Sequence, residues 1–393
     1  MAYFLGPSGI AYIENIRNIF TSVDAIGILG TSTGTTNDIL QNRNKLPQLY
    51  PVFSTSIWFV FCWSLFICSV VAFCLPYFSE FNNFNIVNYY FLVILFALYP
   101  LVVLHLLFQS FLNGFEAYSN IIKSNISVGI FSLILNLILI YYLGVRGVLI
   151  TIIFLPIVLL LYYIYYLKNK LDFKEILKLK YVQPSLLKRY NKFSAILVLS
   201  GIFSPLVYLA IRGQIIQQLG WFEAGIWSAL TRVSTFYLII PTTLISYYFL
   251  PKILKTTTVN RAFVYARKYL ILIIPFFIVL FLILYNTSNF WIKIILTDDF
   301  LSMKAYLKFQ FLGDFFKVIA LIFANYFLAK KKVLIFTVCE IISLASFYFF
   351  SNYFIKDHAL KGVVMAYLLS ITLYLLALSL FFIRQFKKSK STF

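Results

Sequence analysis

Residues 145–167 read VRGVLITIIFLPIVLLLYYIYYL, a run in which Arg146 is the only charged side chain. A helix needs about 20 predominantly apolar residues to cross the hydrocarbon core of a bilayer. Such runs recur along the chain at 9–35, 52–75, 84–112, 121–143, 145–167, 193–217, 221–250, 266–290, 300–329, 333–354 and 359–386. None shows the alternation of apolar and polar residues that is typical of a β-barrel strand. The sequence therefore predicts an all-α polytopic membrane protein with eleven spans.

The composition supports this prediction. Hydrophobic residues make up 62% of the 393 residues and charged residues only 12%, whereas an average soluble domain has roughly 25% charged residues. A soluble globule could not bury that much apolar surface, so the excess must face lipid. The four cysteines all lie in apolar runs, at spacings that match no metal motif, and we expect inert thiols and no metal or cofactor.

The net charge of +20 is explained by where the Lys and Arg residues lie along the chain. Loops that share one side of the membrane hold 23 Lys and Arg: 36–50, 113–124, 168–192, 251–268, 330–332 and the tail from 384. The opposite loops hold four: Arg146, Lys293, Lys356 and Lys361. Because Lys and Arg in short loops favour the cytoplasm, we expect a cytoplasmic C-terminus and an external Met1. The basic excess is a topology signal and does not indicate a nucleic-acid partner.

An internal echo predicts two related lobes. The stretch Leu5–Tyr12 resembles 219–228, and Arg146-Gly147 resembles Lys361-Gly362. The spacing from the first element to the second is nearly the same in both halves, which is typical of a parallel repeat. We expect an N-terminal lobe at 1–167, a basic cytoplasmic linker at 168–192 and a C-terminal lobe of six helices at 193–393.

The repeat and the charge rule carry the same further expectation. In the second half a span at 193–217 precedes the Leu-Gly element, whereas in the first half this element starts at Leu5. An external, uncharged start is also unusual for a chain with an uneven number of spans. Eleven spans therefore read as two six-helix lobes from which the first helix is missing.

The chain resembles the bacterial polysaccharide flippases, in particular the O-antigen and enterobacterial common antigen lipid translocases of the multidrug/oligosaccharidyl-lipid/polysaccharide exporter superfamily. The resemblance is carried by three stretches in order: Phe4-Leu5-Gly6-Pro7-Ser8-Gly9, the segment from Gly225-Ile226-Trp227 to Leu250-Pro251, and the segment from Gly313-Asp314-Phe315-Phe316-Lys317 to Ala329-Lys330. It implies a multi-pass protein of the bacterial inner membrane that works by alternating access on an undecaprenyl-diphosphate-linked oligosaccharide, such as an O-antigen unit. The implied partners are this substrate, membrane lipid and other membrane proteins of polysaccharide and lipopolysaccharide assembly.

Ionisable side chains inside spans are candidate site residues, because each costs about 2.5–3.5 kcal/mol on insertion scales and normally faces a wet cavity or a partner. Arg17 and Arg232 lie at similar depth on helices that the repeat makes equivalent. They could flank a shared cleft and bind a diphosphate through paired N–H donors. The alternative is a structural bond to a helix end or carbonyl, or extension toward the outer interface.

Four further charged residues inside spans each have two possible roles. Arg212, near the outer end of its span, either binds substrate at the outer mouth of a cavity or is an interfacial anchor. Asp24 lies two helical turns after Arg17 and either pairs with it or titrates in ion coupling. Asp314 and Lys317 are helix-surface neighbours. They either form an intrahelical pair, or Lys317 binds the lipid diphosphate while Asp314 orients it.

Three functions are possible for a chain of this kind. The leading prediction is a lipid-linked oligosaccharide flippase; with no Gly-Lys-Ser/Thr nucleotide loop, energy would come from an ion gradient or from consumption of the product. An ion-coupled exporter of small molecules or cationic drugs is the alternative, but it favours unpaired carboxylates, and the spans offer more Arg and Lys than acid. A membrane enzyme would need a sizeable external loop, and the longest here has about ten residues. We therefore expect no enzyme activity.

Overall fold

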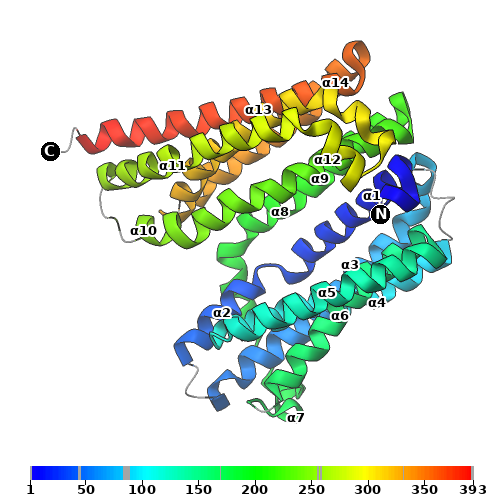
Figure 1. The fold of residues 1–393 in the computed structure, drawn as a ribbon. Helices are drawn as coiled ribbons and strands as arrows, with labels where there is room; N and C mark the ends of the chain where they lie inside the picture. The colour runs from blue at the N-terminus through cyan, green and yellow to red at the C-terminus, as the bar shows by residue number, and fades with distance from the viewer. Residues whose placement is uncertain are drawn as a thin grey trace. The chain divides into compact units, whose positions relative to one another are not determined.

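The computed structural model describes residues 2–42, 46–82, 89–168, 170–254, 256, 259–330 and 332–390, and within these ranges it forms helices and no strands. The α-helices are α1 (Ala2–Ile28), α2 (Thr31–Asn42), α3 (Leu46–Asn82), α4 (Tyr89–Gly114), α5 (Tyr118–Leu143), α6 (Val145–Leu167), α7 (Phe173–Ile176), α8 (Pro184–Leu219), α9 (Trp221–Leu244), α10 (Leu250–Leu254), α11 (Val259–Asn286), α12 (Ser288–Ile295), α13 (Lys304–Ala329) and α14 (Val333–Lys390) (Figure 1). Shorter turns are η2 (Leu179–Tyr181), η3 (Ile245–Phe249) and η4 (Asp298–Met303). Of these, η3 is a π-helix and the other two are 3₁₀-helices.

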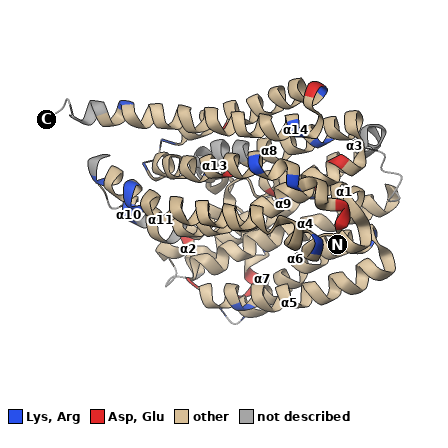
Figure 2. Cartoon of the chain, turned by 45° about the horizontal axis from the view of Figure 1, so that its top comes forward, with Lys and Arg blue, Asp and Glu red and all other residues tan. Residues whose placement is uncertain are grey.

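Seven of the described helices are long and apolar enough to cross a membrane. The last of them, Val333–Phe386 in α14, has 54 residues and contains two of the predicted spans, which are separated by a backbone break at Ala359. Charged residues lie mainly toward the ends of helices, with long uncharged stretches between them (Figure 2). The prediction of an all-α polytopic membrane protein is confirmed.

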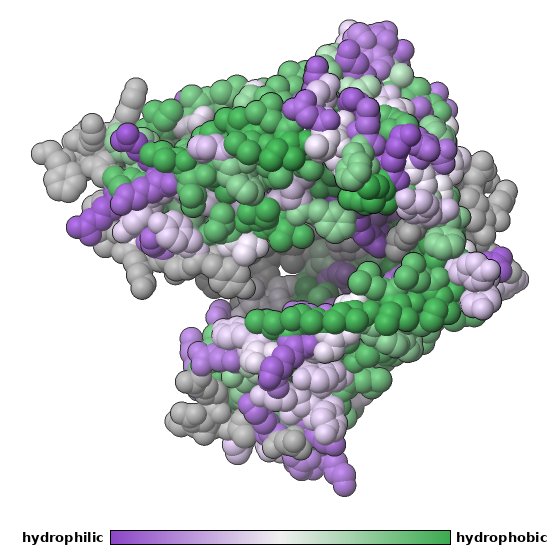
Figure 3. All heavy atoms as spheres, viewed as in Figure 1, coloured by the Kyte–Doolittle hydropathy of each residue, from purple (hydrophilic) through white to green (hydrophobic). Residues whose placement is uncertain are grey.

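The surface of α5 shows why the chain needs lipid. Ile126, Ile130, Leu133 and Leu137 are exposed and follow one another at the three- and four-residue spacing of a single helix face. Figure 3 shows the resulting apolar band along this helix. In water such a contiguous apolar stripe would be unfavourable, whereas hydrocarbon solvates it.

The predicted run 9–35 is divided in the structure. Its helix ends at Ile28, and α2 starts at Thr31 after two residues with positive φ, Leu29 (37°) and Gly30 (67°). Left-handed backbone cannot continue a right-handed helix, so the polar α2 becomes a separate element. The equivalent helix in the second half, α9, continues instead through the π-helical turn η3 into α10.

Backbone breaks recur at matching places in the two halves. Gly6 and Gly220 both have positive φ (60° and 93°) directly before a helical segment of the repeat. Gly144 (φ 56°, ψ −130°) separates α5 from α6, and Ala359 (φ 49°, ψ −138°) breaks α14. Three residues after each of the latter breaks, a glycine lies against the preceding helix. A Cβ atom on Gly147 would lie 2.1 Å from the Leu139 carbonyl oxygen, and one on Gly362 would lie 2.2 Å from the Phe354 carbonyl oxygen. The same local packing is therefore built twice.

The chain packs into two compact units whose limits differ from the predicted lobes. The first unit contains Ile16–Pro205, and the second contains Ala2–Asn15 together with Leu206–Phe393. The division thus falls inside α1 and inside α8. Close packing explains why the start of α1 belongs to the second unit, because a Cβ atom at Gly225 would lie 2.0 Å from the Pro7 carbonyl oxygen. The predicted lobes follow sequence equivalence, whereas these units follow packing.

Candidate functional site

A buried carboxylate in the second unit is the most densely bonded of the predicted site residues. Asp314 lies on α13 and is 0% exposed. Its Oδ1 accepts a hydrogen bond from the Tyr367 hydroxyl (2.6 Å), and its Oδ2 accepts from the Tyr237 hydroxyl and from Gln310 Nε2 (3.1 Å). Ser234 extends the network, because its hydroxyl accepts from Gln310 Nε2 (2.9 Å). The carboxylate is thus solvated by donors from α9, α13 and α14.

Gly313 positions one of these donors. A Cβ atom at Gly313 would lie 2.7 Å from Cε1 of Tyr367, so the absence of a side chain at this position lets the tyrosine ring approach α13 closely. From there its hydroxyl reaches the neighbouring residue, Asp314. The Gly-Asp pair in the sequence is therefore one structural unit, in which the glycine makes room for the tyrosine that bonds the aspartate.

Lys317 does not lie within ion-pair distance of Asp314, which differs from the intrahelical pair considered from the sequence. Both carboxylate oxygens are already bonded by neutral donors, so the insertion cost of Asp314 is lowered without a cation. The ammonium of Lys317 has no hydrogen-bond or ion-pair partner among the described residues, and its side chain is half-buried.

Arg212 is enclosed by the second unit and is only 2% exposed. Its Nε donates to the Ser228 hydroxyl (2.9 Å), and its Nη1 donates to Asn15 Oδ1 (3.1 Å). The guanidinium also lies over the Trp227 ring, 5.2 Å from the ring centroid. These contacts join α8 and α9 to the start of α1. In this conformation Arg212 therefore lies neither on an open surface nor at an aqueous interface.

Arg232 lies close to the same segment of α1. Its Nη2 is 3.7 Å from Oε1 of Glu14, and the arginine side chain is partly exposed. Glu14 and Asn15 are the last two residues of α1 that belong to the second unit, so each contacts an arginine of that unit. Arg17, the predicted counterpart of Arg232, is half-buried and belongs to the first unit.

Asp24 belongs to the first unit and is bonded by Tyr99. The Tyr99 hydroxyl donates to Asp24 Oδ1 (2.9 Å) and lies 3.1 Å from the Phe20 carbonyl oxygen, while the Tyr99 and Phe20 rings stack with centroids 4.4 Å apart. Asp24 forms no ion pair with Arg17 in the described part of the chain, which differs from one of the two interpretations of its role.

Sequence reasoning did not find the tyrosines that solvate both aspartates. Tyr99, Tyr237 and Tyr367 come from helices distant in sequence, and 29 tyrosines give no means of choosing among them. Gln310 was accessible to inspection, because it lies one helical turn before Asp314. Among the described residues no group of three or more His, Cys, Asp or Glu could hold a metal ion.

Comparison with known proteins shows which proteins have a similar sequence. No protein-family model matches the chain. It is 25% identical over 392 residues to the lipid III flippases of Escherichia coli (strain K12) and Shigella flexneri, and each alignment covers 95% of this chain and 90% of the relative. These relatives are flippases by name, in agreement with the expectation that the chain is not an enzyme.

Solved structures share the fold over the whole chain. An inward-facing multidrug resistance MATE family transporter of the MOP superfamily matches with a TM-score of 0.83 at 13% identity, covering 100% of this chain and 93% of the other. A MOP superfamily transporter from Pyrococcus furiosus matches with a TM-score of 0.66 at 14% identity, covering 99% and 90%. The resemblance drawn from the sequence is thereby confirmed: the chain is a multi-pass membrane protein with the fold of MOP superfamily transporters, and it is similar to lipid III flippases over nearly its full length.

Proposed function

We propose that this chain is a flippase that moves an undecaprenyl-diphosphate-linked oligosaccharide across the bacterial inner membrane by alternating access, with its C-terminus in the cytoplasm. The observation that carries the proposal is the similarity to lipid III flippases along 392 residues, without a large unmatched region. The cargo class is the lipid-linked oligosaccharide, and the identity of its sugars is left to experiment.

The charges inside the helices support an anionic cargo. Each carboxylate described above already has a partner: Asp24 has Tyr99, Asp314 has two tyrosines and a glutamine, and Glu14 has Arg232. The Lys317 ammonium lies within a spanning helix, in contrast, and forms no hydrogen bond or ion pair with any described residue. A diphosphate supplies the acceptors that such a cation needs. We assign diphosphate binding to Lys317, Arg17 and Arg232, and a structural role to Arg212.

Alternating access would act on the contacts that hold Ala2–Asn15 on the second unit. The Glu14–Arg232 pair, the Asn15–Arg212 hydrogen bond and the approach of Pro7 to Gly225 all lie in this segment. A partly exposed ion pair contributes only about 0–1 kcal/mol to stability, so the Glu14–Arg232 pair can open within a transport cycle. A diphosphate would compete with Glu14 for Arg232, and cargo binding would thereby release this contact.

The test replaces the two arginines in a cell. Arg17→Ala combined with Arg232→Ala should abolish surface glycan in a flippase-null strain that the wild-type chain rescues, while membrane insertion of a fluorescent fusion persists. The matched control is Arg146→Ala with Arg384→Ala, because both of these arginines are exposed. Rescue by the first double variant at the level of the control would rule out the assigned arginine role.

An ion-coupled small-molecule exporter is the second candidate. The membrane-embedded carboxylates Asp24 and Asp314 favour it, since either could exchange a proton or cation against a gradient. Ion binding at these carboxylates is equally compatible with ion coupling in a flippase, so cargo and coupling must be measured separately.

A further inference from the structure

The connection between α6 and α8 is a folded element. Within this element the Ile176 side chain is buried, and the element is hydrogen-bonded to α3. Three hydrogen bonds make this connection: Trp58 Nε1 to the Leu177 carbonyl (3.0 Å), the Ser54 hydroxyl to the Lys178 carbonyl (2.9 Å), and the Gln183 N–H to the Thr55 hydroxyl (2.8 Å). The backbone direction of residues 176–183 is therefore fixed by α3.

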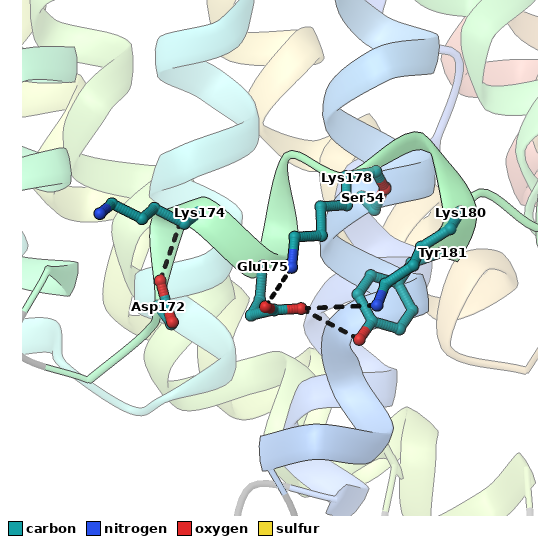
Figure 4. A network of polar contacts seen from close by, with 7 residues as sticks. All are labelled: Ser54, Asp172, Lys174, Glu175, Lys178, Lys180 and Tyr181. Carbon is teal, nitrogen blue, oxygen red and sulfur yellow. Dashed lines mark hydrogen bonds and ion pairs between the residues drawn. The ribbon is translucent and has the colours of Figure 1, made fainter.

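A carboxylate organises the lysines of this element (Figure 4). Glu175 forms ion pairs with Lys178 and, at 4.0 Å, with Lys180, and it accepts a hydrogen bond from the Tyr181 hydroxyl (3.1 Å). The hydrogen bonds from Lys178 and Tyr181 lower the pKa of the Glu175 carboxyl, so it is ionised at neutral pH. Lys174 points away from this network. Lys178 and Lys180 are thus held beside Glu175, whereas the Lys174 side chain extends away from it.

The same element also exposes apolar side chains. Leu177 is 46% exposed and Leu179 is 66% exposed, and they alternate along the chain with Lys178 and Lys180. Both leucines are exposed although Ile176 beside them is buried, because the bonds to α3 fix which side of the backbone faces inward. Exposed leucines among lysines are the composition of segments that lie in the headgroup region of a membrane.

The position along α3 agrees with this depth. α3 has 37 residues and is therefore about 55 Å long, which exceeds the hydrocarbon core of about 30 Å. The element contacts the first third of α3, at Ser54, Thr55 and Trp58, which lie in the N-terminal half of the candidate span Pro47–Cys74. Trp58 is itself of a residue type enriched at membrane–water interfaces.

We propose that residues 172–181 form a preformed anchor for anionic phospholipid: Leu177 and Leu179 enter the acyl boundary, and Lys174, Lys178 and Lys180 contact lipid phosphates. This role is separate from cargo translocation. Each lysine near an anionic surface strengthens the interaction by about fivefold. Bulk phospholipid is the occupant, because it surrounds the spanning helices and complements the charge.

The test places an environment-sensitive fluorophore at Leu179→Cys in a chain whose four native cysteines are replaced by alanine. The protein is reconstituted into vesicles of phosphatidylcholine alone and of phosphatidylcholine mixed with phosphatidylglycerol. We expect blue-shifted emission and quenching by headgroup-labelled lipid, both stronger with phosphatidylglycerol. Lys174→Gln with Lys180→Gln should lower the apparent affinity for phosphatidylglycerol roughly 25-fold.

The matched control is Lys356→Gln with Lys361→Gln, which removes two exposed lysines elsewhere and should leave the emission unchanged. Trp58→Phe provides a second variant, because it frees the Leu177 carbonyl and should reduce quenching without changing charge. Emission that is the same in detergent and in both vesicles would overturn the proposal, as would protection of the fluorophore only by an added protein. Glycan rescue is measured in parallel, so failure of the anchor is distinguishable from failure of the flippase.

Discussion

At the residue scale, both of the aspartates in question are accommodated in membrane helices by hydroxyl donors. Asp24 is bonded by Tyr99, and Asp314 by Tyr237 and Tyr367. A buried carboxylate without partners is very unfavourable, whereas hydrogen bonds from neutral groups offset much of that cost and leave the local cations available. Lys317 therefore keeps an ammonium with no hydrogen-bond or ion-pair partner among the described residues, which supports the proposal that it binds cargo.

Gly313→Ala tests the packing at Asp314. The new methyl group would overlap the Tyr367 ring, displace its hydroxyl from the carboxylate and destabilise the protein by about 2 kcal/mol or more. Gly129→Ala is the matched control, because nothing lies within 4 Å of a Cβ atom at Gly129 in α5. There alanine should be neutral or stabilising by up to about 1 kcal/mol. Unfolding in mixed detergent micelles measures both, and equal effects would contradict the described packing.

At the scale of elements, the repeat can be followed as backbone geometry. Gly144 and Ala359 occupy equivalent breaks with nearly the same φ and ψ, yet only one of them is a glycine. Positive φ costs a residue with a Cβ atom roughly 1–3 kcal/mol. The second half therefore keeps the break at the expense of local strain.

Ala359→Gly should stabilise the chain by about 1 kcal/mol, since it relieves this strain, and Gly144→Ala should destabilise it by about 1–3 kcal/mol. Ala97→Gly, at an exposed position inside α4, is the control and should cost about 1 kcal/mol, as glycine does within a helix. Thermal unfolding in detergent gives the order of the three variants. Destabilisation by Ala359→Gly to the same extent as by Ala97→Gly would contradict the strained break.

The long helices were predictable because each apolar run exceeds the membrane thickness, and the break near Ala359 was predictable because a basic loop element, Lys361-Gly362, recurs there. The separation of α2 from α1 was not, since the residues around Leu29 and Gly30 carry no charge or proline to interrupt the run. The hydrogen bonding of residues 176–183 to α3 could not be predicted from the sequence either, because it depends on tertiary contacts.

At the scale of the whole molecule, sequence and packing describe different divisions of one chain. The repeat predicts lobes from equivalent helices, whereas the start of α1 packs with the second unit through Pro7, Glu14 and Asn15. Only a structure can reveal this, because close packing of glycines and a buried arginine bond leave no periodic signal. The sequence identifies the candidate residues because they are ionisable side chains inside spans. Their hydrogen-bond and ion-pair partners are visible only in the structure.

Transport in purified vesicles is the sharpest test of the proposed cargo class. The chain is reconstituted with an undecaprenyl-diphosphate-linked oligosaccharide, and a membrane-impermeant glycosidase added outside reports sugar that reaches the outer leaflet. We predict time-dependent exposure of sugar above that of empty vesicles, lost in Arg17→Ala/Arg232→Ala, and no movement of a cationic dye. Dye transport driven by an ion gradient, with no exposure of sugar, would contradict the flippase assignment and favour the exporter.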